Sequence, residues 1–226
     1  MSLASVSDTI NSAVGVIPTT PFKPLQSICQ HFCAFHAYAN DLSRHVESHH
    51  FCTHLSPDFH QCLIYDGPGD GEGKFDGRRL IGIEYIVTEK VFNTLPESET
   101  QYWHSHNYEV SSGMLTLLGM KGVPGLATSS AEQPAMIELQ KTYGKTIHTW
   151  QSDIYPDLPL GPPQLMVSYT GPNQLPGHLI EKRDKQYGID TAEQAKKREG
   201  YLDMEFEPSK KADLVMNGGK KVSLDK

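Results

Sequence analysis

Apolar residues recur at intervals of three and four between residues 28 and 46, and this spacing gives the strongest prediction about the fold. The stripe consists of Ile28, Phe32, Phe35, Ala39, Leu42 and Val46. On an α-helix these side chains would cover one face over about five turns. Pro24 would stand in the first turn, where proline is tolerated. We therefore expect a long N-terminal helix that packs against the rest of the domain.

The remainder of the chain alternates irregularly between strand-like and helix-like segments. Strands are expected at 59–65, 79–87, 104–118, 145–151 and 164–169, and the first two should pair across the Gly/Pro/Asp-rich segment 67–77. Helices are expected at 88–95, 129–143, 177–187 and 190–202, the last with a capping box of Asp190 and Glu193. The predicted class is α+β, a largely antiparallel sheet packed by the long N-terminal helix and the C-terminal helices.

The length of 226 residues suits one hydrophobic core. The Ser/Thr-rich residues 1–23 contain three prolines near their end and are expected to form an extended arm. Residues 24–204 form the predicted single domain. Residues 205–226 are lysine-rich with little apolar content, and we expect them to be disordered.

Charge and hydropathy exclude several classes of partner. Acidic residues outnumber basic residues 27 to 20, which argues against a nucleic-acid-binding protein. No run approaches the roughly 20 apolar residues that span a bilayer, so any membrane association is expected to be peripheral. The N-terminus lacks the basic region of a signal peptide, so an intracellular location is predicted.

The four cysteines all lie in the first part of the chain, at Cys29, Cys33, Cys52 and Cys62. Their spacing matches neither a CxxC pair nor a zinc ribbon. We expect reduced thiols that are mostly buried in the core, in preference to a nucleophilic cysteine paired with a histidine.

The chain contains 11 histidines, and His104 and His106 form its sharpest local motif. On a strand both imidazoles would project from one face and share a metal ion. Glu109 would then point to the opposite face unless a bulge intervenes, and it is considered as a ligand or a general base. His148, on another predicted strand, would complete the site. Zinc, copper and iron all suit this set, and a haem stays open.

A second histidine group includes His45 and His49, one helical turn apart if the segment is helical. Glu47 does not follow the first histidine directly, so the metalloprotease signature HExxH is absent. The favoured interpretation is a solvated helix end. The alternative is that His49, His50 or His54 supplies an additional ligand to the metal site.

Other catalytic motifs are missing from the chain. There is no GxSxG, no Walker A and no GxGxxG sequence. A cupin-like metalloenzyme stays as an alternative because of the His-x-His pair, although Glu109 follows too closely and no clear second half is present.

Five segments together resemble the oil body-associated protein family over about residues 25–200. They read HAYANDLSRHVESHHFCTHLSPDFHQCLIYD, RLIGIEYIVTEKVF, LPESETQYWHSHNYEVSSGML, KTYGKTIHTWQSD and LPLGPPQLMVS. This family is known from plant seeds, with relatives in fungi and bacteria. The resemblance implies association with lipid droplets without an oleosin-like hydrophobic hairpin. An amphipathic face, the basic tail or a partner would then mediate binding.

Two main hypotheses follow. In the first, an oil body-associated-like protein binds a transition metal around His104 and His106. In the second, a non-catalytic protein lies on the lipid-droplet surface and its histidines are structural. The expected location is the cytoplasm or the droplet surface.

Overall fold

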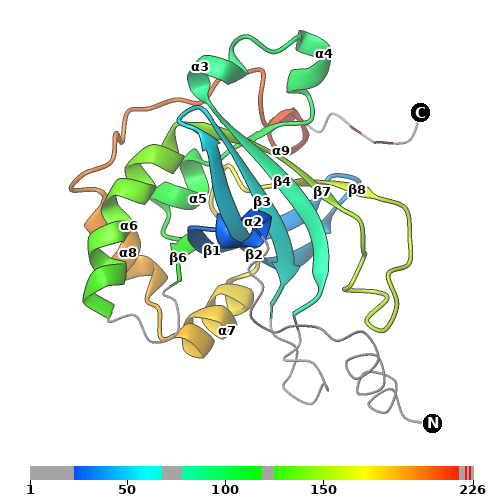
Figure 1. Ribbon diagram of the computed structural model, residues 1–226, viewed down its shortest axis with the longest axis horizontal. Coiled ribbons are helices and arrows are strands. Elements are labelled where there is room, and N and C mark those ends of the chain that lie inside the picture. The colour runs from blue at the N-terminus through cyan, green and yellow to red at the C-terminus, as the bar shows by residue number, and fades with distance from the viewer. Residues whose placement is uncertain (1–22, 68–77, 119–124, 219–221, 223, 225–226) are drawn as a thin grey trace.

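The computed structural model describes residues 23–67, 78–118, 125–218, 222 and 224 (Figure 1). Six strands form a closed antiparallel barrel in the order β1-β2-β3-β4-β7-β8, and β8 pairs back with β1. They are β1 (Gln30–Tyr38), β2 (Asp41–Ser56), β3 (Phe59–Asp66), β4 (Leu80–Thr88), β7 (Thr142–His148) and β8 (Gln164–Val167). Two short strands pair with strands of the barrel: β5 (His104–Ser105) pairs with β7, and β6 (Thr116–Leu117) pairs with β1.

The predicted α+β class with a long N-terminal helix is wrong. Within the described residues, only the four-residue helix α2 (Lys23–Gln26) precedes β1. The predicted helical stripe begins just before β1 and runs through β1 and the following turn into β2. Phe32 belongs to the cluster of buried residues in the barrel interior, whereas Phe35 belongs to a cluster with residues of the C-terminal part of the chain. A strand buried on both faces carries apolar residues on both, so it can imitate helical spacing.

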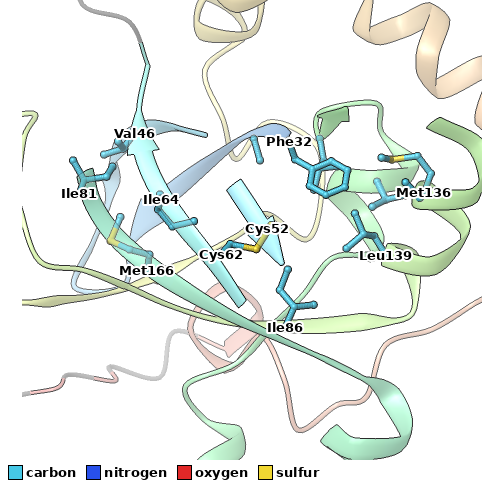
Figure 2. Packing of buried hydrophobic residues seen from close by; sticks show 14 of the residues in the cluster. Phe32, Val46, Cys52, Cys62, Ile64, Ile81, Ile86, Met136, Leu139 and Met166 are labelled. Carbon is cyan, nitrogen blue, oxygen red and sulfur yellow. A yellow bond between two sulfur atoms is a disulfide. The ribbon is translucent and has the colours of Figure 1, made fainter. Parts of the chain in front are cut away.

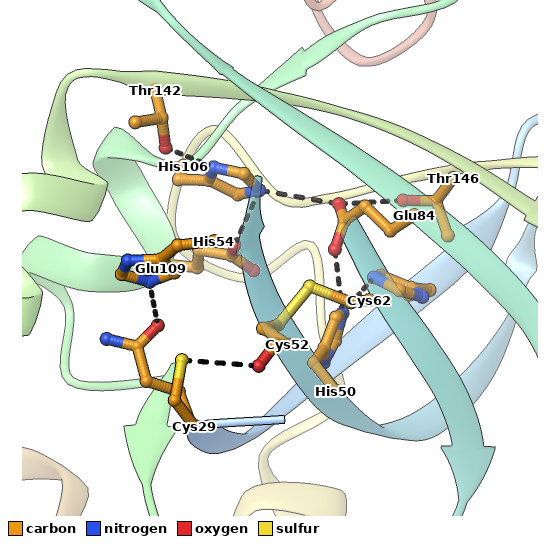
Figure 3. Close-up of a disulfide and its surroundings, with 12 residues drawn as sticks. Cys29, His50, Cys52, His54, Cys62, Glu84, His106, Glu109, Thr142 and Thr146 are labelled. Carbon is orange, nitrogen blue, oxygen red and sulfur yellow. Dashed lines mark hydrogen bonds and ion pairs between the residues drawn. A yellow bond between two sulfur atoms is a disulfide. The ribbon is translucent and has the colours of Figure 1, made fainter. Parts of the chain in front are cut away.

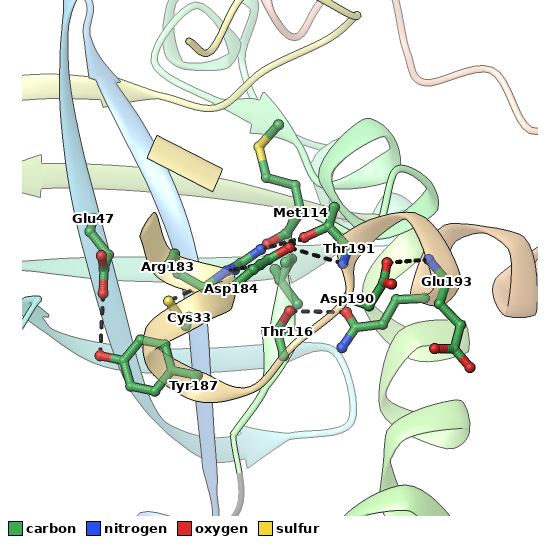
Figure 4. Close-up of polar contacts among 12 residues, drawn as sticks. Cys33, Glu47, Met114, Thr116, Arg183, Asp184, Tyr187, Asp190, Thr191 and Glu193 are labelled. Carbon is green, nitrogen blue, oxygen red and sulfur yellow. Dashed lines mark hydrogen bonds and ion pairs between the residues drawn. The ribbon is translucent and has the colours of Figure 1, made fainter. Parts of the chain in front are cut away.

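Several local predictions are confirmed. β3 and β4 pair antiparallel, as expected for the segments 59–65 and 79–87. Helix α7 (Gly177–Tyr187) ends at Gly188, whose φ of +65° favours glycine. Helix α8 (Thr191–Arg198) begins after Asp190, whose carboxylate accepts a hydrogen bond from the Glu193 N–H (Figure 4).

The other helices are short, apart from α6 (Gly125–Gln140). They are α3 (Glu89–Phe92), α4 (Glu97–Thr100), α5 (Asn107–Ser111) and α9 (Leu214–Gly218). The predicted strand 104–118 therefore contains β5, α5 and β6 in turn. In Figure 1, α5, α6 and α8 lie together on one side of the barrel, and α3 and α4 lie at one end. None of the described helices combines the length and apolar character needed to cross a membrane.

The termini fall partly outside the described residues. Of the predicted arm at residues 1–23, only Lys23 is described, as the first residue of α2. In the segment 205–226, for which the sequence predicts disorder, α9 is formed and Ala212, Asp213 and Val215 are buried. Val215 and Val222 join the apolar cluster outside β1, which supplies contacts that the composition of the tail does not suggest.

A disulfide links Cys52 and Cys62 inside the barrel, so the prediction of four reduced thiols is wrong for this pair. The two residues lie directly opposite each other in the β2–β3 register. Figure 2 shows the bond among buried apolar side chains that include Ile64 and Ile86 of the barrel and Leu139 of helix α6. Cys29 is exposed and Cys33 is buried, and both carry free thiols.

Two fully buried arginines attach the C-terminal helices to the segment between β5 and β6. Arg183 of α7 donates to the Met114 carbonyl oxygen at 2.8 Å (Figure 4). Arg198 of α8 donates to the carbonyl oxygens of Val110 at 2.6 Å and Leu115 at 2.9 Å. These charge-assisted bonds fix the segment that directly follows the His-x-His motif of residues 104–106.

Candidate metal centre

Seven buried ionisable side chains meet in the barrel interior, and we refer to them as the histidine–glutamate cluster. Its members are His36 on β1, His50 on β2, Glu84 on β4, His104 on β5, His106 and Glu109 at the start of α5, and His148 on β7. None of these residues is more than 5% exposed. Burial of so many polar groups is costly unless they pair with one another or with an ion.

Glu84 contacts three of the histidines in the cluster, and Figure 3 shows two of them, His50 and His106, beside its carboxylate. Its Oε1 is 3.3 Å from His104 Nε2 and 3.4 Å from His106 Nε2, and its Oε2 is 3.1 Å from His50 Nε2. The Thr146 hydroxyl also donates to Oε1 at 2.8 Å. Burial alone would raise the pKa of Glu84, but these three imidazoles hold it well below its ordinary value. The carboxylate is therefore ionised.

His106 is held in one orientation by Thr142. The Thr142 hydroxyl donates to the Leu139 carbonyl oxygen at 2.7 Å, so it accepts from His106 Nδ1 at 2.8 Å. With its proton on Nδ1, a neutral His106 directs the lone pair of Nε2 toward the Glu84 carboxylate. Two lone pairs facing each other require a proton or a metal ion between them.

The side chains of Glu109 and His106 lie on the same side of the chain because helix α5 begins between the two residues. His106 is the residue before the helix and Glu109 lies in its first turn, so the two side chains are neighbours at i and i+3. Glu109 Oε1 is 3.8 Å from His106 Nε2, and its Oε2 accepts a hydrogen bond from Ser168 at 2.6 Å. A helix start, and not the bulge considered from the sequence, places this carboxylate.

His104 has unsatisfied ring nitrogens. Among the described residues, neither Nδ1 nor Nε2 of His104 has a hydrogen-bond partner, because the approach of Nε2 to Glu84 is not aligned for one. Burial would lower the pKa of His104, but Glu84, Glu109 and Asp213 together raise it. Each unpaired buried nitrogen is unfavourable unless a further group satisfies it.

Gly144 of β7 provides the space in which the donor atoms converge. A Cβ at this position would lie 2.8 Å from His106 Nε2 and 2.9 Å from His104 Nε2, and would overlap Glu84 Oε1. His104 and Gly144 are directly paired in the β5–β7 register. Only glycine leaves this volume open between three potential ligand atoms.

The remaining imidazoles form a row behind Glu84. His50 Nε2 lies 3.2 Å from His36 Nε2, and His36 Nδ1 lies 3.2 Å from His148 Nε2. Burial lowers the pKa of His148 to about 3, with a further contribution from His50. Burial, together with His50 and His148, also holds the pKa of His36 well below its ordinary value. His36 and His148 are therefore neutral at neutral pH.

The structure brings together His104, His106 and Glu109, the core of the predicted site, and adds His50 from the second histidine group. His148 shares the interior, but it contacts His36 and not His104. The other two proposed ligands lie elsewhere: His49 binds Glu47 and Tyr187, and His54 stacks on His60.

Sequence reasoning missed His36 and Glu84. Glu84 is the one charged residue in the β4 segment LIGIEYIVT, and alternation places it on the same face as the core residue Ile86. This pattern could have identified it. His36 carries no such signal, because the apolar spacing over residues 28–46 predicts a helix there.

Comparison with known proteins identifies similar sequences over most of the chain. The family described as "Protein of unknown function (DUF1264)" matches residues 22–202. Oil body-associated protein 1A of Zea mays is 48% identical over 180 residues, covering 80% of this chain and 69% of that protein. Oil body-associated protein 1B of Arabidopsis thaliana is 44% identical over 185 residues, covering 82% and 69%. Oil body-associated protein 2A of Arabidopsis thaliana is 37% identical over 206 residues, covering 90% and 77%. No solved structure matches the chain.

Proposed function

This chain belongs to the DUF1264 family, and the relatives that its sequence matches are named oil body-associated proteins; we propose that it is a metal-binding member of that family. The barrel would hold one transition-metal ion, zinc, copper or iron. The proposed ligands are Glu84, His104 and His106, with Glu109 as the fourth. His50, which contacts the other oxygen of Glu84, would orient that ligand from behind.

One observation carries the proposal. Glu84 Oε1 and the Nε2 atoms of His104 and His106 surround the space above Gly144. Two imidazoles and a carboxylate are common ligands of zinc and iron. A cation there would satisfy the unpaired His104 nitrogen and separate the facing lone pairs of His106 and Glu84.

The cupin-like alternative receives less support from this geometry. His106 lies at the start of α5 and not on a strand, so the two histidines do not share one strand face. The position of Glu109 beside His106 favours a role for Glu109 as a metal ligand. A general-base role would require a substrate to reach this buried carboxylate.

Metal analysis tests the proposal. Untagged protein purified without chelators or a nickel column should contain close to one transition-metal ion per chain. Glu84→Gln and the double variant His104→Ala/His106→Ala should lose it while keeping the far-ultraviolet circular dichroism of the wild type. His178→Ala, which removes an exposed histidine of α7, is the control and should retain the metal. Retention of the metal by both site variants, or a wild type that neither contains nor takes up metal, would overturn the proposal.

A second role, at the surface of a lipid droplet, is favoured by the loop between β7 and β8. This loop exposes Ile154, Leu158 and Leu160, which are 50%, 60% and 48% exposed. Trp150 Nε1 donates to the Tyr155 carbonyl oxygen at 2.8 Å, and Arg79 donates to the Pro156 carbonyl oxygen, so the loop has a fixed backbone. Exposed apolar side chains this close together in the sequence favour a contact surface, and these would insert into a lipid monolayer.

Flotation with triacylglycerol droplets coated with phosphatidylcholine tests this second role. The wild type should float with the droplets, and Leu158→Asp/Leu160→Asp should stay largely in the soluble fraction. Met204→Asp replaces another exposed apolar residue and should float like the wild type. A wild type that does not float would count against droplet binding itself. Equal flotation of all three proteins would count against this loop.

A further inference from the structure

We propose a second metal site, open to solvent, formed by His54 of β2, His60 of β3 and Glu138 of α6. One ligand atom from each of these residues lies within 4.8 Å of the others. The site shares no residue with the histidine–glutamate cluster. Its ligand chemistry suits a borderline divalent cation such as zinc or copper.

The β2–β3 register creates the histidine pair. His54 and His60 are directly opposite each other close to the hairpin end, so their side chains project from the same face. Their rings stack with centroids 3.9 Å apart and planes inclined by 8°. Glu138 reaches the pair from the helix above, with its Oε1 3.2 Å from His60 Nε2.

The charges of these groups favour a cation. Two protonated imidazoles with ring centroids 3.9 Å apart would repel each other, so the stack favours neutral rings that can bind an ion. The Glu138 carboxylate, 3.2 Å from His60 Nε2, adds an oxygen ligand whose negative charge complements a bound cation. His54 Nε2 lies 2.8 Å from Gln30 Oε1 and donates to it, which leaves the lone pair of a neutral ring on Nδ1.

Exposure distinguishes this site from the barrel interior. His54 and Glu138 are exposed while His60 is buried, so an ion could enter and leave without opening the barrel. A bound ion would also connect α6 to the β2–β3 hairpin. We therefore expect rapid exchange of the ion and an increase in thermal stability on binding.

Calorimetric titration with Zn²⁺ alone, in chelator-free buffer at neutral pH, tests the site. The wild type should bind one exchangeable Zn²⁺ that brief chelator treatment removes, and binding should raise the melting temperature. His54→Ala and Glu138→Gln should each weaken this binding by about tenfold or more and abolish the stabilisation. His178→Ala is the matched control and should behave like the wild type.

Two results would overturn the inference: a wild type without an exchangeable Zn²⁺, or His54→Ala and Glu138→Gln proteins that bind as tightly as the wild type. Both substitutions alter exposed residues, and circular dichroism checks that the variants fold. The proposed interior ion is measured separately, as metal retained after the chelator treatment. Failure of one site is therefore distinguishable from failure of the other.

Discussion

The carboxylate of Asp213 accepts two hydrogen bonds from Ser105, one from its backbone N–H at 2.8 Å and one from its hydroxyl group at 2.7 Å. Ser105 separates His104 from His106, so a residue near the C-terminus fixes the segment that presents both imidazoles. Asp213 is buried, and burial raises its pKa. The two groups lie 108 residues apart in the chain.

We predict that Asp213→Ala destabilises the protein by about 1–3 kcal/mol, because the buried Ser105 N–H loses its acceptor. Metal content should fall as well, since β5 loses its support. Asp213→Asn should have a smaller effect, because asparagine keeps an acceptor and tolerates the positive φ of 59° at this position. Urea unfolding and metal analysis measure the two effects, with the exposed Asp157→Ala as control. An Asp213→Ala protein as stable as the control would contradict this role.

Gly144→Ala is predicted to separate metal binding from folding. The added methyl group would occupy the space between Glu84 Oε1 and the Nε2 atoms of His104 and His106, so these side chains must move apart. We expect metal affinity to fall by about tenfold or more. Gly177→Ala is the control, because nothing lies within 4 Å of the Cβ it would add.

Metal per chain after dialysis against a weak chelator, together with thermal unfolding, distinguishes the two glycine variants. Only Gly144→Ala should release metal. Undiminished retention by that variant would show that the ion does not lie above Gly144.

The parts of the fold that sequence predicted correctly depend on local signals. β3 and β4 alternate with a period of two around a glycine-rich connection, and α7 and α8 carry their own end signals at Gly188 and Asp190. β1 gives no such signal, because burial on both faces replaces alternation with a nearly continuous apolar pattern.

The residues of the candidate site likewise divide into those that local sequence predicts and those that only the fold brings together. His104, His106 and Glu109 lie within six residues, so the sequence alone could group them. Glu84 and His36 reach the group only because the barrel closes, and closure depends on pairings between distant strands. The disulfide likewise follows from the register that places Cys52 opposite Cys62, which no spacing rule predicts.

Removal of the disulfide in Cys52→Ala/Cys62→Ala should lower the free energy of unfolding by about 3 kcal/mol, because the unfolded chain loses the constraint of a short closed loop. Urea unfolding without reductant measures this loss. The wild type in excess reductant should approach the double variant, and the exposed Cys29→Ala should respond to reductant as the wild type does. An unfolding midpoint of the wild type that does not change with reductant would argue against this bond.

Acid should destabilise the protein between about pH 6.5 and pH 3, partly through His31. Burial, with contributions from His49 and Arg78, lowers the pKa of His31 to about 3. Below pH 6.5 the unfolded chain therefore binds a proton that the folded protein does not, so stability falls as the pH falls.

One such proton contributes at most about 1.4 kcal/mol per pH unit, and less here because the ring is partly exposed to solvent. His31→Phe removes the titrating ring but keeps an aromatic side chain stacked on Phe51, where the ring centroids are now 4.2 Å apart. We expect this variant to lose stability less steeply than the wild type from pH 6.5 to pH 4, as measured by urea unfolding at each pH. His36 and His148 titrate in both proteins, so the difference between the two slopes isolates His31. Equal slopes would mean that His31 takes up its proton without loss of the folded state.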